Sequence, residues 1–267
     1  MTYSERADVA TNTLARHLFN LMSEKETNLC LALDETDPDR FMRLADQIGP
    51  EIAVLKTHVD TLEQYESKFT VELATLARDH NFLIFEDRKF SDIGKTVRNQ
   101  YTKGAFTIIE WADIVNAHAI PGPGIVQGLR EEVESYDLLD KRAILLLAQM
   151  SSKGNLITDA YTKQVIKMAD ENDDFVMGFI GAGAGKVPFL AEHSSSGMLI
   201  FSPGVKIGGG GDQLGQQYTS PEELIQAGTD VIIVGSDIYN HADPLEQAKR
   251  YREVCWQGYQ DRITAPK

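Results

Sequence analysis

The stretch FLIFEDRKFSDIG, residues 82–94, joins a buried strand to a cluster of charges. Residues 82–85 are all apolar, as in a strand whose two faces are both covered. The next seven positions contain Glu86, Asp87, Arg88, Lys89 and Asp92. Charges gathered at the end of a core strand are costly to desolvate unless they pair, so this stretch predicts a functional site at the carboxyl end of a strand.

Seven further short apolar runs repeat this strand pattern along the chain. Their starts are spaced by roughly 23 to 33 residues, about the length of one strand-plus-helix unit. Segments of helical character lie between them, for example 38–49 and 220–228, the latter with Ser220 as N-cap and Pro221 in the first turn. The runs begin at Asn28, Ile52, Ile114, Ala143, Phe175, Met198 and Val231.

Eight buried parallel strands that alternate with helices predict the α/β class and a (β/α)8 TIM barrel, in one domain over residues 1–267. The alternative is an open doubly wound sheet. We favour the barrel because no GxGxxG follows the first run and polar residues end nearly every strand. The segment from Asp8 to Ser23 has apolar residues at helical spacing, so we expect one helix there, outside the barrel or across its bottom.

The composition of the chain restricts the classes of binding partner and the cellular compartment expected for the protein. The formal net charge of -14 disfavours nucleic acid or an anionic membrane as a partner. The only two cysteines, Cys30 and Cys255, are far apart in sequence, and we expect reduced thiols in a cytoplasmic protein. No apolar run approaches the roughly 18 residues of a membrane span, and the N-terminus lacks a secretory apolar core.

In a barrel, the polar strand ends meet at one mouth and form the active site. Asp87 and Lys89 are two residues apart, so a regular strand would point both to the same face, and Lys56 ends the neighbouring strand. The alternative to an active site is that these charges form a purely structural network of ion pairs at the rim of the barrel. Asp92 lies beyond the strand and could instead reach a neighbouring subunit. The remaining strand-end residues are Asp34, His58, Asn116, His118, Ser151, Lys153, Pro203 and Ser236.

Six motifs in order over residues 28–260 resemble orotidine 5′-phosphate decarboxylase of the eukaryotic type. They are LKTHVD from Leu55, FEDRKFSDIGKTV from Phe85, WADIVNAH from Trp111, MSSKGNL from Met150, SPGV from Ser202 and LGQQY from Leu214. The DxKxxD core alone is shared by a wider superfamily of barrel decarboxylases and aldolases. The additional motifs in register make the resemblance more specific.

The resemblance implies decarboxylation of orotidine monophosphate to UMP, the last step of pyrimidine nucleotide synthesis, without metal or cofactor. It implies a catalytic charge array of Lys56, Asp87, Lys89 and Asp92, with Asp92 and Thr96 supplied by the other subunit of a homodimer. Losing carbon dioxide leaves a ring carbanion, which the Lys89 ammonium stabilises and protonates. We assign Asp87 mainly to orienting the lysines.

The resemblance also implies the substrate-binding residues. Asp34 and Lys56 would hold ribose hydroxyls, Ser151 the pyrimidine edge, and Gln216 and Tyr218 the phosphate. For Gln216 and Tyr218, the alternative is a purely structural role in a capped loop before the last helix. A strand-end histidine is at least as often a buried hydrogen-bonding residue, so we assign His58 and His118 no catalytic role. The full predicted set is Asp34, Lys56, Thr96, Ser151, Pro203, Gln216, Tyr218, Gly235 and Ser236.

Two glycine-punctuated loops accompany these residues. GGGGDQLGQQY, from Gly208, follows the seventh strand, where barrels commonly bind phosphate through backbone amides. GAGAGKVPFLAEHSSSG, residues 181–197, follows the sixth strand. We expect it to be a mobile lid that closes over the phosphate, with Lys186 as a charge within it.

The chain departs from the family pattern at three positions. Ser236 follows the Val-Gly pair where an arginine that binds the phosphate is usual, so we expect weaker phosphate binding unless Lys186 or another cation compensates. Lys95 and Gln149 stand where Asn and Glu are usual. Two alternatives therefore stay open: a related Mg²⁺-dependent barrel enzyme acting on another sugar phosphate, and a catalytically silent nucleotide-binding protein.

Overall fold

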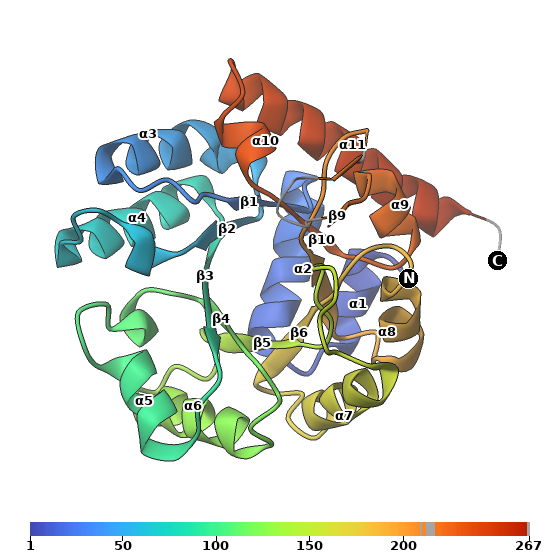
Figure 1. Ribbon diagram of the computed structural model, residues 1–267. Coiled ribbons are helices and arrows are strands. Elements are labelled where there is room, and N and C mark those ends of the chain that lie inside the picture. The colour runs from blue at the N-terminus through green and yellow to red at the C-terminus, as the bar shows by residue number, and fades with distance from the viewer. Residues whose placement is uncertain (209, 212–216, 266–267) are drawn as a thin grey trace.

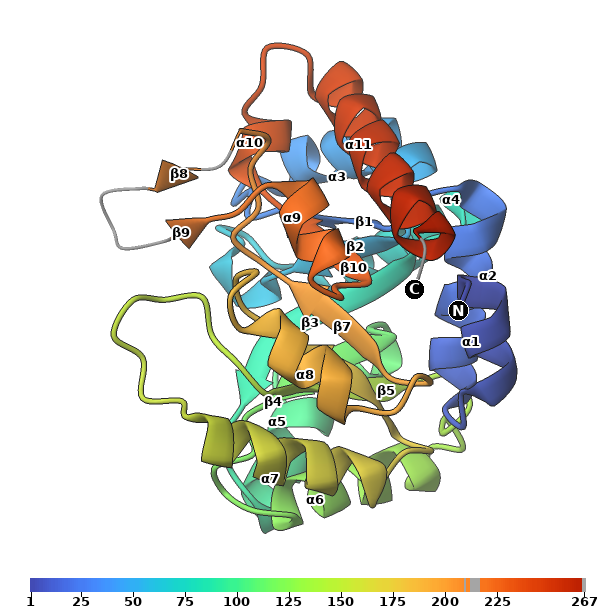
Figure 2. The same cartoon turned by 90° about the vertical axis from the view of Figure 1, so that its right-hand side faces the viewer.

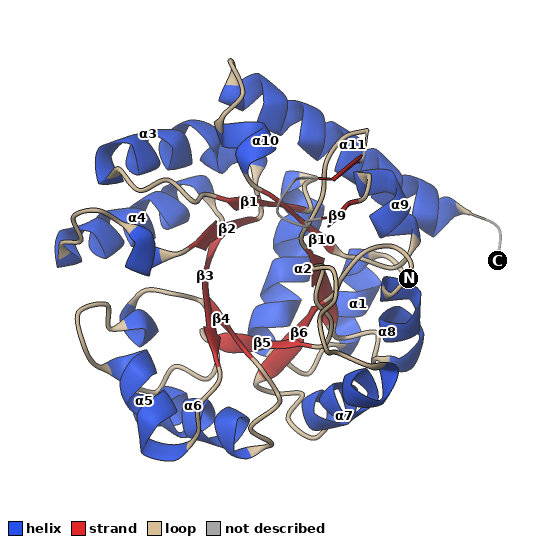
Figure 3. Cartoon of the chain, viewed as in Figure 1, coloured by secondary structure: helices blue, strands red, loops and turns tan. Residues whose placement is uncertain are grey.

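A computed structural model describes residues 1–208, 210–211 and 217–265, and it shows a closed barrel of eight parallel strands (Figures 1 and 3). The order around the barrel is β1-β10-β7-β6-β5-β4-β3-β2. Each predicted apolar run forms one strand, so the barrel is confirmed and the open sheet is excluded. The strands are β1 (Leu29–Ala32), β2 (Val54–Thr57), β3 (Leu83–Phe90), β4 (Ile114–Ala117), β5 (Ala143–Leu147), β6 (Val176–Ile180), β7 (Leu199–Ser202) and β10 (Val231–Val234).

Helices surround the barrel and connect successive strands (Figures 1 and 3). Their starts follow the expected chemistry: Asp37 caps α3, and Ser220 caps α9 in a capping box with Glu223. The helices are α3 (Pro38–Ile48), α4 (Ser67–His80), α5 (Gly94–Thr102), α6 (Gly124–Ser135), α7 (Asp159–Asp170), α8 (Val187–His193), α9 (Pro221–Gln226), α10 (Ser236–Tyr239) and α11 (Pro244–Thr264). The 3₁₀ turns are η1 (Gly49–Glu51), η2 (Val59–Thr61) and η3 (Ile108–Glu110).

The helix expected in the N-terminal segment is present as α2 (Thr13–Lys25), and a second helix, α1 (Tyr3–Val9), precedes it. Asn12 caps the backbone of Ala15 at 2.8 Å and starts α2, which explains the break. The two helices close the end of the barrel opposite the short strands β8 (Gly210–Gly211) and β9 (Gln217–Tyr218) (Figure 2). Arg6 of α1 fixes this end, because it pairs with the fully buried Asp230 just before β10.

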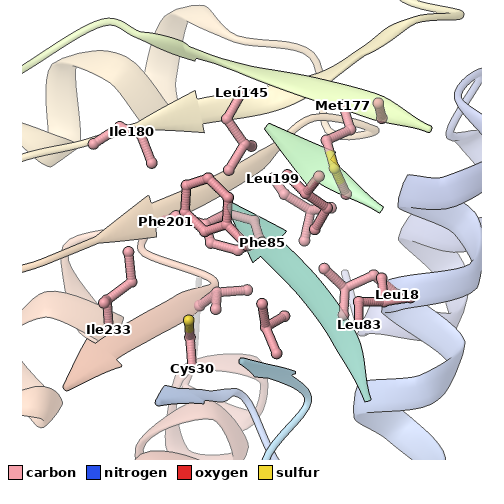
Figure 4. Close-up of a cluster of buried hydrophobic side chains, with 14 of the residues drawn as sticks. Leu18, Cys30, Leu83, Phe85, Leu145, Met177, Ile180, Leu199, Phe201 and Ile233 are labelled. Carbon is pink, nitrogen blue, oxygen red and sulfur yellow. The ribbon is translucent and has the colours of Figure 1, made fainter. Parts of the chain in front are cut away.

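The barrel interior is a packed apolar core rather than a channel (Figure 4). Phe85 and Phe201 meet edge to face with ring centroids 6.1 Å apart, and Leu83 lies toward Leu18 of α2. Truncating a fully buried phenylalanine costs about 3 to 5 kcal/mol, so Phe85 is a major contributor to this layer. The layer also forms an apolar floor beneath the polar mouth.

The segment predicted as a long lid is shorter than expected. Residues 187–193 form the helix α8, so only residues 181–186 connect β6 to it. Pro188 lies in the first turn of α8, where a missing N–H is tolerated, and apolar Val187 and Leu190 are buried. In the described part of the chain, no helix is both long and apolar enough to cross a bilayer.

Candidate active site

Four charged side chains of alternating sign form a line across the mouth of the barrel. The Lys56 ammonium lies 3.5 Å from Asp34 Oδ1 and 3.3 Å from Asp87 Oδ2. The Lys89 ammonium donates to Asp87 Oδ1 at 2.5 Å. The order Asp34, Lys56, Asp87, Lys89 joins the ends of three strands. The sequence placed these four residues at strand ends, but the array predicted from the resemblance had Asp92 as its fourth member and Asp34 as a ribose-binding residue.

The strand register explains why Lys56 and Asp87 face the barrel axis. Lys56 lies opposite Ala32 of β1 and Phe85 of β3, and the ring of Phe85 is in the interior. Asp87 is two residues beyond Phe85 and so continues on the same face. Lys56 and Asp87 therefore lie directly above the apolar layer, and both are largely shielded from water, which strengthens the electrostatic interaction between them.

The backbone at Lys89 is not that of a regular strand, which corrects the reason we gave for its direction. Lys89 has φ of +47°, and the pairing of β3 with β4 shifts register between Glu86 and Phe90. A left-handed conformation is costly for a lysine and persists only where the surroundings hold it. Here the Lys89 N–H donates to Asn116 Oδ1 at 2.6 Å.

Asn116 is a site residue to which the sequence reasoning gave no role. Its Nδ2 donates to Asp87 Oδ1 at 2.6 Å, while its Oδ1 accepts from the Lys89 backbone. The Asn116 amide thus holds both the Asp87 carboxylate and the backbone turn at Lys89. Its position at the end of β4 was a signal, because polar strand-end residues converge in this fold.

Burial and the neighbouring charges shift the pKa values of Lys56 and Asp87 in opposite directions. Burial alone would lower the pKa of Lys56, but the Asp87 and Asp34 carboxylates outweigh it and raise that pKa. Burial would raise the pKa of Asp87, yet Lys56 and Lys89 lower it to about 2. Both groups are therefore charged at neutral pH.

Two histidines also lie at the mouth. His58 Nε2 is 3.4 Å from Asp87 Oδ2, and burial together with the charge of Lys56 lowers the pKa of His58. Burial, then the charge of Lys89, lowers the pKa of His118. Both imidazoles are neutral at pH 7, and His58 contacts the array although we had assigned it no role.

A second carboxylate supports the array from the other face of β3. Glu86 is fully buried and accepts from Thr57 Oγ1 at 2.6 Å and from the Val59 N–H at 3.2 Å. These bonds tie β3 to the end of β2, where Lys56 and His58 lie. Burial raises the pKa of Glu86 to about 7.

Asp92 and Thr96 do not join the array within one chain. Both are exposed, and Asp92 Oδ1 accepts from the neighbouring Ile93 N–H at 2.8 Å. Ile93, between them, is half exposed as well. The shared site predicted for these residues stays a prediction.

Ser151 lines a pocket of about 500 Å³ between the loops that follow β5 and β6. Lys186 and Thr219 line the same pocket. Gln149 shapes it, because its Nε2 donates to the Lys186 carbonyl at 2.7 Å and its Oε1 accepts from Ala182 N–H. A glutamate at this position would lack the donor, which gives a physical reason for the departure at Gln149.

Three of the predicted substrate-binding residues lie at the ends of β7 and β10. Pro203 directly follows β7, and Gly235 and the exposed Ser236 directly follow its neighbour β10. Tyr218 ends β9, which pairs with β8. Gln216 lies outside the described residues, as do 209 and 212–215 of the glycine-rich loop.

Among the residues that the structure describes, no group of three or more His, Cys, Asp or Glu side chains has an arrangement suited to a metal ion.

Comparison with known proteins agrees with this geometry. A model of the family described as "Orotidine 5'-phosphate decarboxylase / HUMPS family" matches residues 27–251. The chain is 45% identical to the orotidine 5'-phosphate decarboxylase of Magnusiomyces magnusii, covering 98% of this chain and 96% of that protein. It is 46% identical to the enzyme of the same name from Phycomyces blakesleeanus, covering 100% and 97% of the two chains.

A crystal structure of orotidine 5'-monophosphate decarboxylase from Methanocaldococcus jannaschii, in complex with the inhibitor BMP, has the same fold, with a TM-score of 0.67 and 21% identity. The match covers 86% of this chain and 98% of that one. Since the family model and the close relatives span nearly the whole sequence, the chain belongs to the orotidine 5′-phosphate decarboxylase / HUMPS family.

Proposed function

We propose that the chain decarboxylates orotidine 5′-monophosphate to UMP, the last step of pyrimidine nucleotide synthesis, and that residues 1–267 act as one decarboxylase domain. The observation that carries the proposal is the alternating line of Asp34, Lys56, Asp87 and Lys89 above the apolar core. Lys56, Asp87 and Lys89 are three of the four catalytic charges that the family resemblance implies, and relatives about 45% identical to this chain are named orotidine 5'-phosphate decarboxylase.

The chemistry needs a cation next to the carbon that loses its carboxylate. When the carbon–carbon bond breaks, its electron pair stays on the pyrimidine ring and carbon dioxide leaves. The Lys89 ammonium stabilises that pair and then donates a proton to the same carbon. Because it is already oriented by Asp87 at 2.5 Å, little reorganisation is needed in the transition state.

The remaining polar groups position the nucleotide. Asp34 and Lys56 would bind ribose hydroxyls, and Ser151, which lines the pocket between the loops after β5 and β6, would bind the pyrimidine edge. Asp87 orients both lysines through contacts at 2.5 and 3.3 Å. The phosphate would lie at the ends of β7 and β10, where barrels of this type commonly bind it.

We further propose a homodimer in which Asp92 and Thr96 complete the partner's site. Their exposure supports this, because side chains that complete a partner's site must lie at the surface of their own subunit. Cys30 and Cys255 are free and buried, which supports a reducing compartment such as the cytoplasm.

An ultraviolet assay with orotidine monophosphate tests the reaction. We expect the nucleotide's absorbance to change to that of UMP, at the same rate with and without a chelator. Loss of turnover in chelator would favour the Mg²⁺-dependent relative instead. Binding of UMP without turnover would identify a catalytically silent homologue.

A further inference from the structure

A lysine that the sequence reasoning did not consider lies beside Ser236. Lys206 is in the loop after β7, and its ammonium is 3.5 Å from Asp237 Oδ1, the residue that directly follows Ser236. β7 and β10 are paired neighbours in the barrel, so this ion pair spans the ends of both strands. The Lys206 side chain is about half exposed, at 48%.

A second set of bonds fixes this ion pair to α11. The Ile207 N–H donates to Tyr251 Oη at 3.0 Å, and the Tyr251 hydroxyl donates to Asp237 Oδ2 at 2.6 Å. Gln247 Nε2 donates to the same oxygen at 3.1 Å. Asp237 therefore has one oxygen held by α11, and its other oxygen faces Lys206.

The backbone places Lys206 close to two of the predicted substrate-binding residues. Its N–H donates to the Thr219 carbonyl at 3.2 Å, and the Thr219 N–H donates to the Gly204 carbonyl at 3.0 Å. Thr219 follows Tyr218, and Gly204 follows Pro203. The lysine thus lies between the segments that end β7 and β9 and the end of β10.

The position of Lys206 in the fold favours a phosphate ligand over a purely structural ion pair. A phosphate monoester carries about -1.5 to -2 charges at pH 7, and the loops after the seventh and eighth barrel strands commonly bind such groups. Lysine has three donor hydrogens, so one ammonium can contact the Asp237 carboxylate and a phosphate oxygen together. Exposed ion pairs contribute little to stability, so the ammonium can reorient toward a phosphate at small cost.

We propose that Lys206 supplies the cation that binds the substrate phosphate where Ser236 replaces an arginine, and that Asp237 is a positioning residue that holds the ammonium ready. This inference rests on the proposed function. It also separates two lysines: Lys186 lines the pocket with Ser151 after β5 and β6, whereas Lys206 follows β7 and its ammonium lies beside Asp237, just after β10.

Lys206→Met tests the proposal, because it keeps an apolar stem of similar length and removes the charge. We expect affinity for UMP and kcat/KM for orotidine monophosphate to fall by about 10- to 100-fold, as expected for one charge-assisted contact. Affinity for uridine and kcat/KM for orotidine, which lack the phosphate, should stay at the wild-type values. Adding Ser236→Arg to Lys206→Met should restore the nucleotide values.

Lys249→Met is the matched control. Lys249 is an exposed lysine of α11 and lines the same pocket as Glu51, which precedes β2 at the opposite end of the barrel. Lys249→Met should leave the affinities for UMP and uridine, and kcat/KM for orotidine monophosphate and orotidine, at the wild-type values. Unchanged UMP binding by Lys206→Met would overturn the proposal, and so would an equal loss for UMP and uridine, which indicates a structural role. A loss confined to Lys186→Met would also overturn it.

The same measurements separate this inference from the proposed function. A wild-type chain that binds UMP more tightly than uridine but leaves orotidine monophosphate unchanged would contradict the decarboxylase alone. A wild-type chain that binds UMP and uridine equally would overturn the role of Lys206, whatever its turnover.

Discussion

The Lys89 ammonium reaches Asp87 Oδ1 at 2.5 Å because the chain turns into a left-handed conformation at Lys89, with φ of +47°. In a regular strand the side chains of Asp87 and Lys89 would point to the same face and run parallel to each other. The turn instead brings a donor and an acceptor of the same strand together above the core. Asn116 holds both the turn and the carboxylate.

Lys89→Ala should abolish turnover while UMP binding largely survives. The lysine acts on charge that exists only in the transition state, and positioned proton transfer alone is worth about 10²- to 10⁴-fold. Turnover is measured by absorbance and UMP binding by calorimetry, with the exposed Lys103→Ala as control. Retention of even a tenth of wild-type turnover would show that Lys89 is not the proton donor.

Asn116 variants test whether the amide positions the array. Asn116→Ala should lower kcat by about 10-fold or more with little change in KM, and lower the free energy of unfolding by about 1 to 3 kcal/mol. Asn116→Asp keeps the acceptor for the Lys89 N–H but puts a carboxylate 2.6 Å from Asp87. Two such carboxylates share a proton, so kcat should gain a pH dependence near neutrality. A pH profile that overlays the wild-type profile would argue against this role.

The fold was predictable because its signals are local and repeated. Eight apolar runs such as 143–147 are buried on both faces, and the spacing between them fits one helix each. The capping box at Ser220 was equally readable, since it depends on residues three apart. The charges at Asp34, Lys56 and Asp87 followed from their strand-end positions once the barrel was assumed.

Features set by tertiary contacts were not predictable in the same way. The turn at Lys89 depends on Asn116, 27 residues later in the chain. The helix α8 is short and follows a glycine-rich stretch, so its segment resembled a continuous loop. The Lys206 pair depends on Asp237 and on Tyr251 of α11, and no local pattern joins these residues.

Glu86 predicts a pH-dependent stability. Burial raises the pKa of Glu86 from 4.5 to about 7, so between these values the folded chain keeps a proton that the unfolded chain releases. The free energy of unfolding should therefore fall as the pH rises through this range, by about 3 kcal/mol in total from this group. Glu86→Gln cannot titrate and should lack this contribution.

Denaturant unfolding at pH 4.5 and at pH 8 measures the effect. The stability of Glu86→Gln relative to wild type should increase by about 3 kcal/mol between the two pH values. Glu72→Gln, which removes an exposed carboxylate, is the control for a change of net charge. A constant difference between Glu86→Gln and wild type across this range would contradict a protonated Glu86 in the folded chain.

Mixing two inactive variants tests the shared site. If Asp92 of one subunit completes the array of the other, a heterodimer of Lys89→Ala and Asp92→Ala contains one site with every group intact and one that lacks two. Random exchange of subunits makes half of the dimers hetero, so the mixture should regain about a quarter of wild-type activity. Lys89→Ala mixed with Asp87→Ala is the matched control, because Asp87 and Lys89 belong to the same subunit's array and no intact site forms. If the first mixture shows only the summed activity of its parents under conditions where subunits exchange, Asp92 does not act across an interface.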